Sequence, residues 1–168
     1  VELHTLAEAV AGAELIFSSL KGSEVVGALS TLRDAIGSTP LVDTTNPLSF
    51  PDGGAPVLTV SNTDSLGEQI QRALPAAPVV KALNTLSYEL MVAPRLVGNG
   101  NHVLPICGNS AAAKTAVTQV LQQVGWPESA FLDLGDISNA RGMEAWMLYW
   151  FRIMAKLGTA RFGMQIVT

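Results

Sequence analysis

Polar residues stand at the ends of three apolar runs that read as β-strands, and they are the residues best suited to bind a ligand. Ser18 and Ser19 end the first run, Asn46 and Pro47 follow the second, and Asn84 follows the third. If the strands are parallel, these ends meet at the carboxyl edge of one sheet, where open α/β sheets bind ligands. Proline keeps the preceding asparagine out of the helical region, so its amide is held in place. The alternative is ordinary turn chemistry, because Ser, Thr, Asn and Pro are common in turns.

Other kinds of reactive site find little support in the sequence. The two histidines, His4 and His102, and the single cysteine, Cys107, are too few and too scattered to predict a zinc site. The sequence also lacks the G-x-S-x-G turn of a serine hydrolase. We therefore expect neither a metal site nor a hydrolytic one.

Apolar strand-like runs alternate with segments of helical periodicity along the chain. This alternation predicts an α/β fold with a Rossmann-like, mostly parallel sheet, which positions the strand ends. A loop rich in proline and glycine is expected at 48–55. The expected strands are 1–4, 15–18, 41–44, 57–60, 79–83, 102–107, 131–134 and 164–167. The expected helices are 5–12, 23–37 capped by Ser23, 65–75 opening at a capping box, 87–92, a helix capped near Asn109 or Ser110 that stops at Gly125, and 138–157.

Composition narrows the classes of partner. The chain has 168 residues, of which 48% are hydrophobic and 14% charged. This length and hydrophobic content are sufficient for the buried core of one domain. A net charge of -4 argues against nucleic acid or an anionic membrane as the main partner. The most apolar run, 143–157, carries three charged residues and is short for a membrane span. One cysteine cannot form an internal disulfide, so we expect a cytoplasmic protein.

The predicted helix 138–157 is apolar over an unusually broad surface. One stripe carries Ala140, Met143, Met147, Trp150 and Met154, and more apolar side chains lie beside it. Such a surface is covered from more than one side. It is either buried across its own domain or forms the interface of a dimer, the homo-oligomer that we expect.

Four longer stretches carry a family resemblance. They are D-T-T-N-P-L at 43–48, V-V-K-A-L-N-T at 79–85, I-C-G-N-S-A-A-A-K at 106–114 and L-D-L-G-D-I-S-N-A-R-G-M-E at 132–144. In order and spacing they resemble the NADP-dependent oxidoreductases that use the deazaflavin coenzyme F420. The resemblance implies a dinucleotide-binding α/β domain with a small C-terminal helical portion, usually dimeric. It also implies NADP(H) as cofactor and hydride exchange with coenzyme F420 or a related acceptor.

The resemblance further implies which residues bind the cofactor. Hydride transfer between two cofactors depends on stacking their rings more than on a protein acid or base, so no catalytic side chain is expected. Leu20-Lys21-Gly22 departs from the family's Pro-Gly turn, and Met143 stands where the family has a small polar residue. The residues placed against the ribose and phosphates are Ser18, Ser19 and Leu20, and those placed near the nicotinamide are Asn46, Pro47, Ala82 and Asn84.

The family's opening strand, G-x-G-x-x-G turn and helix have no counterpart in the printed sequence. The opening V-E-L-H-T-L-A-E-A-V resembles the family's third strand and the helix after it, so we expect an N-terminally truncated Rossmann-like domain. Residues 1–100 are then the remainder of the dinucleotide-binding domain, and residues 101–168 are a C-terminal strand and helix portion. Two functions stay open: an NADP-dependent oxidoreductase in the complete protein, or a non-catalytic α/β dimerisation module that has lost cofactor binding.

Overall fold

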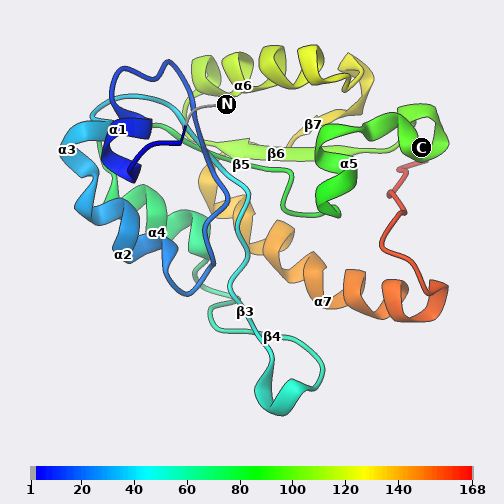
Figure 1. Ribbon diagram of the computed structural model, residues 1–168. Helices are drawn as coiled ribbons and strands as arrows, with labels where there is room; N and C mark the ends of the chain where they lie inside the picture. Colours follow the sequence, from blue (N-terminus) through cyan, green and yellow to red (C-terminus); the bar gives the residue numbers. More distant parts are fainter. Residues whose placement is uncertain (1–2, 168) are drawn as a thin grey trace.

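Five strands form the central sheet of the computed structural model, which describes residues 3–167 (Figure 1). β1 runs parallel to β2 and β2 to β5, β6 is antiparallel to β5, and β7 is parallel to β6. The predicted α/β fold with a mostly parallel sheet is therefore confirmed. The sheet continues across residue 100, the boundary predicted between two portions of the chain. In spatial order the strands are β1 (Ile16–Ser18), β2 (Leu41–Asp43), β5 (Val79–Ala82), β6 (Leu104–Gly108) and β7 (Phe131–Asp133).

Helices cover both faces of this sheet (Figure 1). Successive strand residues point to opposite faces, so Leu41 and Val79 join one core cluster while Val42 and Val80 join the other. All four are fully buried, as expected for strands covered on both sides. The first cluster packs against α1 (Leu6–Val10), α2 (Val25–Thr31), α3 (Arg33–Ile36), α4 (Leu66–Ala73) and α7 (Ala140–Leu157), and the second against α5 (Tyr88–Val92) and α6 (Ala111–Val124).

The start of α4 and both ends of α6 fall where the capping residues predict. Ser110 caps α6, because its hydroxyl accepts a hydrogen bond from the amide of Ala113 at 3.2 Å, and Gly125 ends the helix with φ 117°. At the start of α4, the hydroxyl of Ser65 accepts from the amide of Glu68 at 3.1 Å. Side-chain oxygens thus satisfy amides that have no partner within their own helix.

The helix predicted at 23–37 is instead two short helices, α2 and α3, which meet at Leu32. Ser23 is not the cap, since its hydroxyl donates to the carboxylate of Glu24. The hydroxyls of Ser30 and Thr31 donate to backbone carbonyls one turn earlier, a competition that bends and ends helices. Gly37 does end the segment as predicted.

A small β-hairpin replaces the loop predicted at 48–55 and the sheet strand predicted at 57–60. β3 (Leu48–Ser49) pairs antiparallel with β4 (Val57–Leu58) in a sheet of its own. In Figure 1 the hairpin extends away from the main sheet, on the side of α7. Phe50 anchors it there through an edge-on contact with Phe151 of α7.

Neither terminal strand forms in the described residues. The strand predicted at 1–4 lies partly outside them, and Leu3 and His4 form no strand. The strand predicted at 164–167 is wrong, because this segment makes one hydrogen bond to the sheet region, from the amide of Val103 to the carbonyl of Met164 at 2.7 Å. Side-chain packing holds the tail instead, with Phe162 stacked on Trp150 at 5.3 Å between ring centroids.

Short 3-10 turns and the long helix α7 complete the fold. Met143, Met147 and Trp150 on the predicted stripe of α7 are buried against the chain's own core. Within residues 3–167, no helix is both long and apolar enough to cross a membrane. The 3-10 turns are η1 (Pro51–Gly53), η2 (Pro94–Leu96), η3 (Gly98–Gly100), η4 (Glu128–Ala130) and η5 (Ile137–Asn139).

Candidate functional site

The polar residues after β1, β2 and β5 do meet at one edge of the sheet, because these three strands run parallel. The hydroxyl of Thr44 donates to the carbonyl of Ser18 at 3.1 Å and lies 3.3 Å from the hydroxyl of Ser19. We call the group formed by Ser18, Ser19, Thr44, Asn46 and Asn84 the polar edge. It lies at the carboxyl ends of its strands, the usual ligand side of such a sheet.

Asn46 and Asn84 form the centre of the polar edge. The amide nitrogen of Asn46 donates to the backbone carbonyl of Asn84 at 2.9 Å, and the amide nitrogen of Asn84 donates to the side-chain oxygen of Asn46 at 2.9 Å. Asn84 also donates to the carbonyl of Met143 at 3.1 Å, which joins the pair to α7. The two asparagines therefore fix each other rather than standing free in a loop.

Two buried oxygens at the polar edge have no hydrogen-bond partner among residues 3–167: the hydroxyl of Ser18 and the side-chain oxygen of Asn84. Asn84 is 1% exposed and Ser18 4% exposed. Leaving a buried polar atom without a hydrogen bond costs about 1–3 kcal/mol of stability, so buried polar atoms normally have a hydrogen-bond partner. Leu83, immediately before Asn84, has a left-handed backbone with φ 66°, a strained conformation of the kind that collects at ligand sites.

The other predicted binding residues divide between two surroundings. Ser18, Ser19 and Leu20 line a cavity of about 360 Å³, whose other walls are apolar side chains of α1, β1 and α2. That volume lies in the range of small-molecule pockets. Pro47 is buried beside Asn46, whereas Ala82 is fully buried in the core cluster beneath α6. The structure thus pairs Asn46 with Asn84, brings Ser18 and Ser19 to Thr44, and places Leu20 on the cavity side.

Beneath the polar edge lies a buried cluster of charges, which we call the charge cluster: Asp43, Lys81 and Glu144. The ammonium group of Lys81 lies 2.7 Å from a carboxylate oxygen of Asp43 and 2.8 Å from one of Glu144. Lys81 and Asp43 are fully buried, and Glu144 is 1% exposed. Burial alone would lower the pKa of Lys81, but the two carboxylates outweigh burial and raise its pKa. Lys81 therefore stays charged.

Every charge in the cluster also has hydrogen-bond partners. Lys81 donates to the carbonyl of Thr45 at 2.6 Å, and Asp43 accepts from the amide and hydroxyl of Thr45 at 2.9 and 2.7 Å. Glu144 accepts from the first two amides of α4, those of Leu66 at 2.9 Å and Gly67 at 3.0 Å. The second carboxylate is thus compensated by the N-terminus of a helix, where a negative charge is stabilised.

The charge cluster was not predicted from the sequence. The available signal was Lys81 itself, which stands inside the apolar run V-V-K-A-L. A lysine in a fully covered strand needs acidic partners, because an isolated buried charge is very costly. The partners lie 38 and 63 residues away in the chain, at Asp43 and Glu144, so only the fold identifies them.

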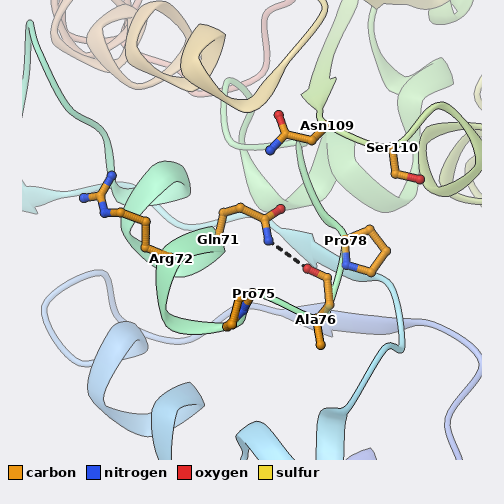
Figure 2. A pocket seen from close by; sticks show the side chains of 8 residues that line it. Gln71, Arg72, Pro75, Ala76, Pro78, Asn109 and Ser110 are labelled. Carbon is orange, nitrogen blue, oxygen red and sulfur yellow. Dashed lines mark hydrogen bonds between the residues drawn. The ribbon is translucent and has the colours of Figure 1, made fainter.

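A larger cavity, of about 630 Å³, lies at the opposite edge of the sheet, between the end of α4 and the start of α6 (Figure 2). Its polar side chains are engaged by the protein. Gln71 donates to the carbonyls of Leu74 and Ala77 and accepts from the amide of Val79, and Arg72 pairs with Asp64 at 2.8 Å. Size alone does not make a site, and the polar edge remains the candidate.

Metal chemistry and thiol chemistry have no support in the described part of the chain. Residues 3–167 contain no group of three or more potential metal ligands. Cys107 lies in the core, and burial raises the pKa of its thiol to about 12, so the nucleophilic thiolate is not formed at neutral pH.

Comparison with known proteins identifies the fold independently. A hypothetical protein from Sinorhizobium meliloti has 24% sequence identity and a TM-score of 0.63, over 79% of this chain and 62% of that one. Pyrroline carboxylate reductase from Plasmodium falciparum, solved with NADP bound, has 13% identity and a TM-score of 0.52, over 93% and 52%. These distant likenesses concern the fold. Neither a protein-family model nor a curated protein matches the chain.

A more similar structure gives the class and the family. The chain has 43% sequence identity and a TM-score of 0.91 to a candidate F420-dependent NADP-reductase from Arthrobacter sp. FB24, over 96% of this chain and 73% of that one. The fold and this similarity identify an NADP-dependent oxidoreductase. Within that class, the chain belongs to the family of F420-dependent NADP-reductases.

Proposed function

We propose that the polar edge binds the nicotinamide half of NADP(H), and that the complete protein transfers hydride between NADPH and coenzyme F420 or a related acceptor. The observation that carries the proposal is the unpartnered side-chain oxygen of Asn84, buried at the carboxyl edge of the sheet. The nicotinamide carboxamide carries an N–H donor of the kind this oxygen needs. The family relationship supports the same ligand.

The residues of the polar edge bind and orient but hold no acid or base. NADPH supplies the hydride when bound. Asn84 is locked by Asn46 and by the carbonyl of Met143, so its side-chain oxygen has a fixed direction; this oxygen and the hydroxyl of Ser18 are both buried, so a ligand bonds to them only when the strand ends move apart. Fixing a ring in the correct orientation is the main catalytic contribution that a protein makes to transfer between two cofactors.

The phosphate side of the ligand lacks its usual partner in this sequence. Residues 1–168 contain no G-x-G-x-x-G turn. Charge-assisted hydrogen bonds contribute about 1.5–3 kcal/mol each, so about three missing contacts lower the affinity by about three to six orders of magnitude. We expect residues 1–168 alone to bind NADPH more weakly than micromolar, which calorimetry or nicotinamide fluorescence will measure. Micromolar binding would contradict this expectation.

Reduced nicotinamide mononucleotide separates the two halves of the ligand. If the polar edge holds the nicotinamide, this smaller compound binds residues 1–168 about as well as NADPH, and its NMR shift changes centre on Ser18, Asn46 and Asn84. Asn84→Ala removes the acceptor and abolishes the changes, whereas Asn109→Ala, at the opposite edge, leaves them intact. Shift changes centred on the cavity beside Gln71 would refute the site. F420 reduction by the complete protein then tests the hydride acceptor, and its absence favours the non-catalytic module.

We also propose that the outer face of α7 pairs two copies of the chain. Its inner stripe is covered by the chain's own core, but Leu148 and Tyr149, on the outward side of the helix, are 38% and 61% exposed. A central aromatic residue in an interface contributes about 2 kcal/mol, or about thirtyfold in Kd. Sedimentation should therefore show a dimer that Tyr149→Glu weakens by about that factor. Tyr88→Glu, on exposed α5, is the control, and a monomeric wild type would count against the proposal.

A further inference from the structure

The charge cluster and the polar edge are joined by the backbone at two places. Thr45, whose carbonyl accepts from Lys81 and whose amide donates to Asp43, immediately precedes Asn46. Met143, whose carbonyl accepts from Asn84, immediately precedes Glu144. Asn46 therefore follows Thr45, which is hydrogen-bonded to Lys81 and Asp43. Asn84 is hydrogen-bonded to Met143, the residue before Glu144.

The cluster also connects four elements of the fold. Asp43 ends β2, Lys81 lies in β5, Glu144 lies in α7, and the amides that Glu144 accepts from begin α4. A shift of β2, β5 or α7 would stretch a buried ionic contact of less than 3 Å, and a shift of α4 would stretch its amide hydrogen bonds to Glu144. The relative positions of the strand ends and of α7 are thereby fixed.

Stability alone does not account for such a cluster. Removing charges from water is costly, and replacing a buried ion cluster by well-packed neutral residues is often neutral or stabilising. Buried ionic groups are retained in some proteins because they specify one geometry. Here the geometry they specify is that of the two asparagines directly above them.

We propose that Asp43, Lys81 and Glu144 are positioning residues, which hold Asn46 and Asn84 in their hydrogen-bonded orientation at the edge proposed to bind the nicotinamide. The link to nicotinamide rests on the proposed function, whereas the positioning of the asparagines does not. The cluster acts through the carbonyl and amide of Thr45 and through the Met143–Glu144 backbone, and it contacts no ligand itself.

The test compares a neutral cluster with the wild-type chain by NMR. The triple variant Asp43→Asn, Lys81→Met, Glu144→Gln removes all three charges and leaves none unpaired. We expect side-chain amide protons of Asn46 and Asn84 to exchange with solvent about ten- to a hundredfold faster, the equivalent of one lost charged hydrogen bond. The backbone amide of Val117 in α6 reports global unfolding and is expected to exchange at an unchanged rate.

A matched control separates positioning from general destabilisation. Val80→Ala alters a fully buried neighbour of Lys81 on the opposite face of the sheet, so it weakens the fold without touching the cluster. In this control, the asparagine amides and Val117 should accelerate together. The proposal is overturned if the asparagine amides of the triple variant exchange as in the wild type, or only in step with Val117.

Two further measurements keep the outcome decisive. If the triple variant does not fold, Thr45→Val removes one hydrogen bond to Asp43, and unchanged exchange at Asn46 in that variant overturns the proposal. Titration with reduced nicotinamide mononucleotide distinguishes the two proposals. Faster asparagine exchange with unaltered binding supports positioning but refutes the nicotinamide site, whereas weaker binding with unchanged exchange refutes positioning.

Discussion

Replacing Lys81 alone by methionine is expected to destabilise the protein by about 3–5 kcal/mol, because it leaves two buried carboxylates without their cation. Methionine fills a similar volume, so the loss reports charge rather than a cavity. Domains of this kind are stable by about 5–15 kcal/mol in total, so the variant will be close to unfolding at room temperature. Urea unfolding followed by circular dichroism measures the change in the free energy of unfolding.

An exposed ion pair provides the control for Lys81→Met. Arg161 and Glu89 lie 2.7 Å apart, but their side chains are 58% and 28% exposed. Arg161→Met removes a cation from an equally short contact, and the expected cost is far smaller than that of Lys81→Met because solvent screens the pair. If Lys81→Met costs no more than Arg161→Met, then the cluster does not hold the buried charges that the structure places there.

The single and triple variants together separate stability from geometry. The triple neutral variant should be more stable than Lys81→Met, although it carries two more substitutions, because no uncompensated charge remains. Substitutions in one contact network are not additive, so this inversion is expected on physical grounds. A triple variant more stable than Lys81→Met would show that Lys81→Met destabilises the protein because two buried carboxylates lose their cation, and not because the lysine side chain itself is lost.

Much of the fold could be predicted because it depends on local patterns in the sequence. The core strands are short apolar runs, and the limits of α6 follow from Ser110 and Gly125. The meeting of Ser18, Asn46 and Asn84 followed from one inference, that the three strands are parallel. These features depend on residues close together in the sequence, and a periodic pattern of that range can be interpreted without knowing the fold.

What could not be predicted depends on distant contacts or on marginal local preferences. The hairpin β3–β4 has strands of two residues each, too short for a periodic signal, and its packing against Phe151 comes from α7. The break between α2 and α3 depends on hydroxyls of Ser30 and Thr31 that bond either the backbone or the solvent. The charge cluster joins residues from three separate elements, so a single sequence contains no pattern for it.

Gly22, in the stretch that differs from the family's Pro-Gly turn, lies close to the backbone of Asn46. A Cβ atom at this position would lie 2.0 Å from the backbone carbonyl oxygen of Asn46 and 2.9 Å from its carbon. Loop 18–22 therefore packs directly on the backbone that carries Asn46. In the stretch Leu20-Lys21-Gly22, the glycine is needed for this close approach and not for an unusual φ angle.

Gly22→Ala is accordingly expected to destabilise the protein by about 1–3 kcal/mol through overpacking and to displace Asn46 from Asn84. Urea unfolding measures the first effect, and the NMR shifts and exchange rates of the two asparagine side-chain amides measure the second. Because the clash is with backbone atoms, no side-chain rotation relieves it. The loop or the strand end must move, and the hydrogen-bonded asparagine pair lies at the point of contact.

Gly27 is a matched control five residues away. It lies exposed within α2, and nothing stands within 4 Å of the position its Cβ would take. Alanine is the better helix former by about 0.8–1.0 kcal/mol, so Gly27→Ala should stabilise the protein by up to that amount and leave the asparagine resonances in place. The same substitution is thus expected to have opposite signs at two nearby glycines. Equal effects at both positions would mean that loop 18–22 does not pack on Asn46, and the polar edge would lose the contact that sets its shape.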